Sequence, residues 1–271
     1  KALAGLCFGG AHAVLSRVPG GVRCPVCSAR LVCLARPVTS DRLVREWGID
    51  RSWQKLCDDR EGEICVACGA SLRVRQLASA ILAWLESRGD LSTTLAAAVR
   101  DGAMRRFDVA EINSCGALHT TIARLPRLSY SEYAPDDAAV RHEDLMALSY
   151  PDESFDLVLH SDTLEHTPDV DKALSEIRRV LRPGGASIFT VPIVRDGRPT
   201  RVRAEVRDGA THHILEPSYH GGSFQTTRQY LVYYEFGGDF VARVSGAGFE
   251  VVLREHGVNP AVVTFIATRP A

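Results

Sequence analysis

The stretch FDVAEINSCGALHTTIARL, residues 107–125, decides the fold of this chain. It predicts a buried strand, a short loop and a helix, because an apolar run of strand length precedes a turn and then apolar residues at helical spacing. Where such a loop holds a nucleotide, it usually carries several glycines that let the ligand approach the backbone. Here the loop contains Gly116 alone. The stretch is therefore either an altered cofactor loop or an ordinary turn.

The overall composition is that of a globular protein. The chain has 271 residues, of which 45% are hydrophobic and 24% charged, enough for one large domain and a small one. A formal net charge of −1 gives no global field that would attract nucleic acid or anionic lipid. Residues 1–20 also fit a signal peptide that begins with Lys1, but glycines and His12 interrupt them. We expect a cytoplasmic protein with no membrane partner.

From residue 101 onward, strand and helix patterns alternate, which is typical of a parallel sheet with crossover helices. We expect strands over residues 107–112, 127–133, 155–162, 186–194, 249–256 and 261–268. We expect helices over residues 119–125, 170–181 and 239–249, with RPGG ending the second of them. This order predicts a doubly wound α/β sheet with its ligand at the carboxyl ends of the strands.

The segment LSYPDESFDLVLHSDTLEHTPDVDKALSEIRRVLRPGGASIFTVPIV, residues 148–194, resembles class I S-adenosylmethionine-dependent methyltransferases of the type 11 group. The family pattern is P-x-x-x-F-D, a strand, L-E-H, a helix, L-x-P-G-G and another strand, and every part of it is present. The resemblance covers about residues 107–268. It implies a seven-stranded Rossmann-like sheet and S-adenosylmethionine as the methyl donor; the other interpretation is a different doubly wound enzyme.

The resemblance places the loop after the first strand against the amino-acid part of the cofactor. Usual members have an acidic residue followed by three spaced glycines, whereas here Glu111 keeps the acid, Gly116 keeps one glycine and Asn113 fills another position. In one alternative, Asn113 and Cys115 still present backbone groups and small side chains to the cofactor. In the other, the chain has lost cofactor binding and is a non-catalytic pseudo-methyltransferase. We favour binding, because the remaining cofactor positions are intact.

Those remaining positions carry suitable chemistry. A ribose diol is well held by a carboxylate, and Glu132 ends the second strand where the family has that acid, followed by Tyr133. Asp144 and Leu145 match the pair that accepts from the adenine amino group and lines its ring. Alternatively, Glu132 and Asp144 are solvated acids at a strand end and in a loop. The third strand adds two residues that we expect to face the cofactor, His160 and Ser161.

Candidates for a catalytic base lie in THHILEPSYHGG, residues 211–222, inside a polar insertion at about residues 195–238. A histidine with a pKa near 6.5 is suited to taking a proton from a positioned hydroxyl. Alternatively, the segment is a structural lid, or it binds a catalytic metal. The candidates are His212, His213, Tyr219 and His220, with Glu216 beside them; Glu165 and His166 of the L-E-H motif are assigned to local packing.

Two C-x-x-C pairs, Cys24 with Cys27 and Cys65 with Cys68, are separated by 37 residues. Thiolates with this spacing complete a tetrahedral structural zinc site, which would stabilise a module too small to fold on apolar burial alone. This section resembles the zinc-binding N-terminal segment of certain bacterial class I methyltransferases, which often occur in glycan or secondary-metabolite pathways. The resemblance rests on W-G, R-E-G, C-x-x-C-G and R-x-R-x-L elements within residues 47–77.

These patterns divide the chain into an N-terminal segment at 1–22, a zinc-ribbon-like module at 23–75, a linking helix at 76–100 and a methyltransferase domain at 101–271. The leading function is methylation of a small molecule or glycan, on oxygen. The alternative function is methylation of an RNA or a protein that binds to the zinc module. The module has ten Arg and Lys against seven Asp and Glu, too small an excess for a nucleic-acid grip, and nothing indicates the oligomeric state.

Overall fold

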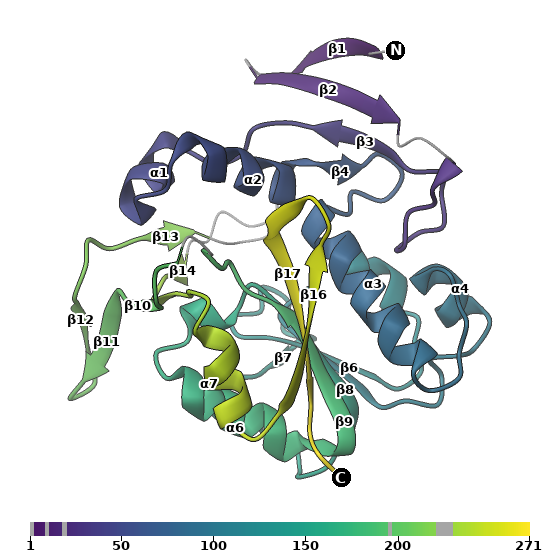
Figure 1. Ribbon diagram of the computed structural model, residues 1–271. Coiled ribbons are helices and arrows are strands. Elements are labelled where there is room, and N and C mark those ends of the chain that lie inside the picture. Colours follow the sequence, from purple (N-terminus) through teal and green to yellow (C-terminus); the bar gives the residue numbers. More distant parts are fainter. Residues whose placement is uncertain (1–2, 9–10, 18–20, 195–196, 221–229) are drawn as a thin grey trace. The chain divides into compact units, whose positions relative to one another are not determined.

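The computed structural model describes residues 3–8, 11–17, 21–194, 197–220 and 230–271 (Figure 1). The chain forms two compact units. The first comprises Lys1–Arg106, Gly116–Pro126 and Arg254–Val263, and the second comprises Phe107–Cys115, Arg127–Leu253 and Thr264–Ala271. The first unit thus extends past the boundary predicted at residue 101 and takes in two later segments. Within the described residues, every helix is too short or too polar to cross a membrane.

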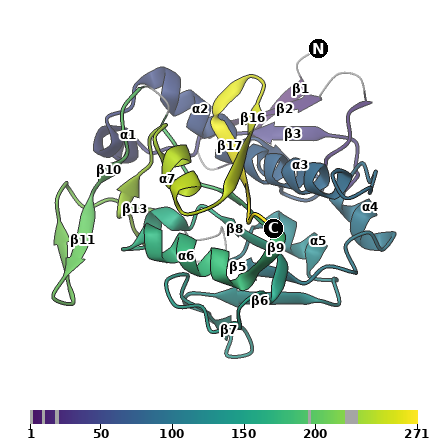
Figure 2. The same ribbon diagram turned by 60° about the horizontal axis from the view of Figure 1, so that its bottom comes forward.

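The second unit is built on a seven-stranded sheet in the order β16-β17-β9-β8-β5-β6-β7 (Figure 2). Pairing is parallel from β9 through β8, β5 and β6 to β7, and antiparallel between β17 and β9. This mixed seven-stranded sheet is consistent with the predicted Rossmann-like α/β fold. The strands are β5 (Val109–Ile112), β6 (Leu128–Glu132), β7 (Arg141–His142), β8 (Phe155–Ser161), β9 (Leu181–Thr190), β16 (Glu250–His256) and β17 (Asn259–Thr268). Residues 254–263 of the last two strands and the turn between them are counted with the first unit.

Burial explains why these segments form strands. Six of the seven residues of β8 are buried, as expected for a parallel strand covered on both faces. Helix α6 (Val170–Val180) buries its periodic apolar face, and Asp169 caps its first turn by accepting from the backbone N of Lys172 at 3.0 Å. Helix α7 (Phe240–Gly246) is tied to α6 by Arg243, whose Nε donates to Asp171 at 2.7 Å.

One boundary differs from the prediction. RPGG does not lie between a helix and a strand; it belongs to β9, which begins at Leu181 directly after α6. At Gly185 a Cβ atom would meet the carbonyl oxygens of Arg182 and Asp156 at 2.9 and 3.1 Å. The glycine therefore permits a close approach of two backbones in the sheet rather than ending the helix.

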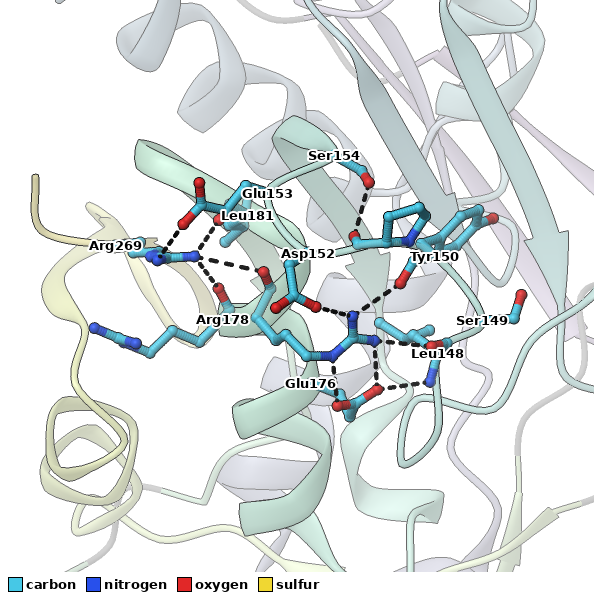
Figure 3. A network of polar contacts seen from close by, with 12 residues as sticks. Leu148, Ser149, Tyr150, Asp152, Glu153, Ser154, Glu176, Arg178, Leu181 and Arg269 are labelled. Atoms are coloured by element: carbon cyan, nitrogen blue, oxygen red, sulfur yellow. Dashed lines mark hydrogen bonds and ion pairs between the residues drawn. The ribbon is translucent and has the colours of Figure 1, made fainter.

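An ion-pair network fixes the loop that precedes β8 (Figure 3). Arg179 of α6 donates to Glu176 and Asp152, each at 2.7 to 2.8 Å, and to the carbonyl oxygens of Leu148 and Tyr150. Arg269, just after β17, donates to the carbonyl oxygen of Leu181 at 2.6 Å. Loop, helix and sheet are thereby joined at the edge opposite to the carboxyl ends of the strands.

The polar insertion contains short strand pairs that the sequence patterns did not predict. They are β10 (Arg201–Val202) with β15 (Tyr234–Glu235), β11 (Ala204–Arg207) with β12 (Ala210–His213), and β13 (Tyr219–His220) with β14 (Tyr230–Leu231). Glu235, 2% exposed, pairs with Arg201 at 2.7 Å and with Arg203, which is equally buried. A buried ion pair is costly to break, so these contacts hold the first and the last part of the insertion together.

The first unit has a four-stranded antiparallel sheet, β1 (Leu3–Phe8), β2 (Ala11–Arg17), β3 (Val32–Ala35) and β4 (Ile64–Cys65). Its helices are α1 (Asp41–Trp47), α2 (Arg51–Gly62), α3 (Leu72–Glu86), α4 (Leu95–Arg100) and α5 (Ala117–Ile122). In α3 the predicted apolar face of Leu77, Ile81, Trp84 and Leu85 is buried. The helix begins before the predicted residue 76, because Ser71 caps it by accepting from Val74 at 3.3 Å.

Candidate functional site

The loop after β5 is shaped by side chains where a typical cofactor loop has glycines. Glu111 is fully buried, and its Oε1 accepts from the backbone N of Cys115 at 2.8 Å. Asn113 has a left-handed backbone with φ of 58°, and its Oδ1 accepts from the backbone N of Tyr133 at 2.8 Å. Asparagine tolerates this conformation better than most residues. The loop therefore keeps a defined course with few glycines.

Gly116 precedes α5 and has φ of 64° and ψ of −131°, with no side-chain cap of the helix. It is also the residue at which the chain passes from the second unit to the first. This backbone conformation is almost restricted to glycine, since a Cβ would clash with the local backbone. The single glycine thus stands at the loop position where no other residue fits without strain. This backbone requirement explains why the loop NSCGALH has a glycine at this position, although it lacks the other glycines that a typical cofactor loop contains.

Glu132 ends β6, the strand next to β5, as the sequence predicts. One carboxylate oxygen, Oε1, accepts from the backbone N of Ser114 at 3.1 Å and from the hydroxyl of Tyr130. Burial and the bond to Glu132 raise the pKa of Tyr130 above its ordinary value, so the hydroxyl stays a donor. No hydrogen bond to Oε2 occurs among the described residues. That oxygen is available to a donor from a ligand, which suits a ribose diol.

Asp144 and Leu145 follow β7, the strand beyond β6, so they lie after the carboxyl end of a neighbouring strand. Leu145 is 3% exposed, and Asp144 is partly exposed. The Oδ1 atom of Asp144 accepts from the backbone N of Met146 at 2.8 Å. Tyr133, by contrast, is 51% exposed and packs near the ring of His142. An apolar side chain beside a partly exposed acid is compatible with the adenine position that the sequence predicts.

His160 does not face an open cleft, contrary to the sequence-based expectation. It is fully buried in β8 and stacks on Phe189, with ring centroids 4.6 Å apart and planes 16° apart. Neither ring nitrogen has a hydrogen-bond partner among the described residues. Burial lowers the pKa of His160 to about 3, so the ring is neutral near pH 7. The next residue, Ser161, is 8% exposed at the end of β8 and shares a hydrogen bond of 2.8 Å with Thr190.

The predicted base candidates do not gather in one place. His212 and His213 are exposed on β12, whereas Tyr219, 40% exposed, and the half-buried His220 belong to β13. His220 instead packs against His166, with ring centroids 4.9 Å apart. Glu165 and His166, which the sequence patterns assigned to local packing, join His220 in a group whose possible ligand atoms lie within 4.8 Å of one another.

The four paired cysteines come together in the first unit, as their spacing predicts. The Sγ atoms of Cys24, Cys27, Cys65 and Cys68 lie within 4.8 Å of one another. The Sγ atoms of Cys24 and Cys68 are 3.8 Å apart, and zinc bonds of about 2.3 Å in a tetrahedron place two sulfurs about 3.8 Å apart. The hydrogen bond from Cys68 lowers the pKa of Cys24 to about 5. The donor set and its spacing therefore fit zinc.

The two knuckles share one backbone geometry, although they are distant in sequence. After the first, the backbone N of Ser28 donates to the carbonyl oxygen of Cys24 at 3.0 Å; after the second, Gly69 donates to Cys65 at 2.8 Å. Ser28 and Gly69 both have positive φ, 69° and 75°. Cys33 lies outside the group, and burial raises its pKa to about 11, so it is a neutral thiol.

Comparison with known proteins identifies the fold's central part. The family model described as a methyltransferase domain matches residues 64–189, a little under half of the chain. The C-methyltransferase UbiE of ubiquinone/menaquinone biosynthesis from Hahella chejuensis is 33% identical over 138 residues, 51% of this chain and 48% of that protein. The malonyl-[acyl-carrier protein] O-methyltransferase of Halorhodospira halophila is 34% identical over 88 residues, 32% of this chain and 29% of that protein.

Among solved structures, S-adenosylmethionine-bound CalS10 from Micromonospora echinaspora, an amino pentose methyltransferase of calicheamicin biosynthesis, is 18% identical with a TM-score of 0.41. It covers 70% of this chain and 96% of that one, a likeness too low to bear on function. The chain spans less than half of the length of the curated relatives cited above. Over residues 64–189 the chain is therefore similar to methyltransferase domains.

Proposed function

We propose that this chain transfers a methyl group from S-adenosylmethionine to an oxygen atom of a small molecule or glycan. The observation that carries the proposal is the hydrogen bonding of the two carboxylate oxygens of Glu132. One of its carboxylate oxygens holds the β5 loop through Ser114, and the other has no hydrogen bond among the described residues. A carboxylate arranged in this way positions a loop and a sugar diol at once.

Each proposed cofactor contact has a physical role. Glu132 accepts from the ribose hydroxyls, and the turn held by Glu111 presents backbone N–H groups to the amino-acid part. The side chain of Cys115 is 1% exposed and packs in the core, so it does not contact the cofactor as the sequence predicted. Asp144 accepts from the adenine amino group, with Leu145 as an apolar wall. Gly116 continues the loop in a conformation that only glycine adopts readily. Ser161 lies at the end of β8, the strand beside β5.

The bound cofactor supplies an electrophilic methyl group on a sulfonium, which needs in-line alignment more than protein chemistry. The chain's own residues then hold the acceptor and remove a proton if the acceptor is a hydroxyl. His212, His213, Tyr219 and His220 remain the candidates, since all four belong to the insertion that follows β9. The family match supports methyl transfer, while the relatives' names cover both carbon and oxygen acceptors.

We also propose that the four-cysteine group binds zinc with a structural role. Four thiolates close the coordination shell of the metal, which leaves no position for a substrate. Binding energy at such a site is folding energy for the residues that carry it. The symmetric knuckles and the 3.8 Å separation of two sulfurs support this assignment.

A transfer experiment tests the proposed activity. The purified chain is incubated with S-adenosylmethionine labelled at the methyl group and with a panel of hydroxylated small molecules and oligosaccharides, and the label is traced by mass spectrometry. We expect label on the oxygen of at least one compound, and less label with Glu132→Gln at a limiting concentration of the donor. Label that appears only in added RNA or protein would move the substrate to the alternative class. Absence of transfer to every class, together with absence of cofactor binding, would contradict the proposal.

A further inference from the structure

Glu165, His166 and His220 form a compact group in the second unit. Glu165 and His166 belong to a short 3-10 helix, η2 (Leu164–His166), which follows the carboxyl end of β8 after a turn. His220 is the last residue of β13, so it is brought there by the insertion. The possible ligand atoms of these three residues lie within 4.8 Å of one another. Two imidazoles and a carboxylate are a common ligand set for divalent transition metals.

The orientation of His166 is fixed by a hydrogen bond outside the group. Its Nδ1 lies 2.9 Å from the carbonyl oxygen of Leu231, which only accepts. Nδ1 therefore carries the proton, and Nε2 presents its lone pair on the side of Glu165. Metal-binding histidines are usually held in this manner, because a backbone carbonyl fixes both the tautomer and the direction of the ring.

The distance between the carboxylate and the imidazole also fits a metal. Oε1 of Glu165 and Nε2 of His166 are 3.7 Å apart, which is too long for a hydrogen bond. Two ligands that each lie about 2.1 Å from one tetrahedral ion are about 3.4 Å apart. Glu165 is fully buried, and a cation beside it offsets the cost of removing its charge from water.

The neutral tautomer fixed by Leu231 is the form of His166 that binds a metal, through Nε2. Around the group lie the ring of Tyr230, with its centroid 5.8 Å from that of His166, and the backbone of Leu231. Three protein ligands leave a coordination position open for another oxygen.

We propose that Glu165, His166 and His220 bind a divalent transition-metal ion, zinc in the first instance, with an open position for water or an oxygen atom of the methyl acceptor. This assignment makes His220 a metal ligand, and it leaves His212, His213 and Tyr219 as the base candidates of the proposed reaction. The metal site rests on the geometry of the three residues and does not depend on the proposed methyl transfer. It is separate from the four-cysteine group, which lies in the first unit.

Metal content tests the proposal on the full chain. The protein is dialysed against buffer with micromolar zinc, and bound zinc is measured by mass spectrometry for the wild type, Glu165→Gln, His220→Ala and His212→Ala. We expect the wild type and His212→Ala to hold one zinc ion more than Glu165→Gln and His220→Ala. His212 is the matched control, because it is an exposed histidine of the same insertion. Zinc affinity at this site should fall at least about tenfold in the two ligand variants.

Cobalt substitution separates the two sites without reference to activity. Thiolate-to-cobalt charge-transfer bands report the cysteine group, whereas an ion held by nitrogen and oxygen adds only weaker ligand-field bands. We expect Glu165→Gln to lose the weaker bands and keep the thiolate bands, with a circular dichroism spectrum equal to that of the wild type as evidence that the variant is folded. The proposal is overturned if the wild type binds metal at the cysteines alone, or if all four proteins hold the same amount of zinc.

Discussion

At the scale of single residues, Glu132 links the shape of the protein to its proposed ligand. Its Oε1 atom accepts from Ser114 and Tyr130, so the carboxylate is already oriented before a ligand arrives. Preorganisation of this kind lowers the entropic cost of binding. The sequence predicted the residue and its strand-end position, but not its bond to Ser114, because that contact depends on how the β5 loop turns.

Replacement of Glu132 by glutamine should weaken binding of S-adenosylhomocysteine by roughly 1–3 kcal/mol, the range for loss of charge-assisted hydrogen bonds. Titration calorimetry on the purified variant measures this change. Glu250→Gln is the matched control, since Glu250 is an exposed glutamate on β16 in the same unit. An affinity that is equal in the wild type and both variants would reject the role given to Glu132.

His160 was predicted to contact the cofactor, but it is part of the core. A histidine at the end of a strand beside the cofactor loop predicted a contact with the ligand, but the ring stacks on Phe189 and is fully buried. Its depth follows from the packing of β8 against β9, which local sequence does not specify. With a folded-state pKa of about 3 and an ordinary value of 6.5, it remains neutral in the folded protein while the unfolded chain takes up a proton.

The unfolded state therefore binds more protons than the folded state between pH of about 3 and 6.5, so the free energy of unfolding falls as the pH is lowered through that window. His160→Phe removes this contribution and keeps an aromatic ring. Between pH 6.5 and 5, we expect the wild type to lose about 1.6 kcal/mol more stability than the variant. Urea unfolding at both pH values measures the difference, and parallel pH profiles would contradict the assignment.

At the scale of elements, the β5 loop replaces glycines by a buried carboxylate and an asparagine. Glu111 and Asn113 each accept from a backbone N–H, and Gly116 supplies the one conformation that needs glycine. The sequence predicted strand, loop and helix here from apolar spacing alone. The short strands of the insertion could not be predicted, because their residues are polar and pair in segments of two to four.

The paired knuckles lead to a prediction for the first unit. Cys65→Ser should abolish zinc binding at the four-cysteine group and unfold the residues around it, since folding and metal binding are coupled. Cys33→Ala, which changes a buried thiol outside the group, should retain the zinc. Zinc content and circular dichroism with and without a chelator measure both effects. A zinc content of Cys65→Ser equal to that of the wild type, or a melt unchanged by chelation, would contradict the assignment.

At the scale of the whole molecule, the sequence predicted the type of sheet better than it predicted the limits of the two units. Alternating strand and helix patterns predicted the doubly wound sheet, because parallel strands require crossover helices. The segments 116–126 and 254–263 belong to the first unit although they lie within the sequence of the second. The group of Glu165, His166 and His220 was missed for a similar reason. His220 is distant in sequence from Glu165 and His166, and only the fold brings it to them, although L-E-H shortly after a strand was a signal.

The central claim is that a loop with a single glycine still holds the methyl donor, because acids on neighbouring strands supply the remaining contacts. Calorimetric titration of the full, zinc-loaded chain with S-adenosylmethionine and S-adenosylhomocysteine tests this most directly. We predict saturable heat at one site for both ligands and an upward shift of the melting temperature. A flat titration with an unshifted melting temperature, from protein whose zinc content and circular dichroism show it to be folded, would contradict the account.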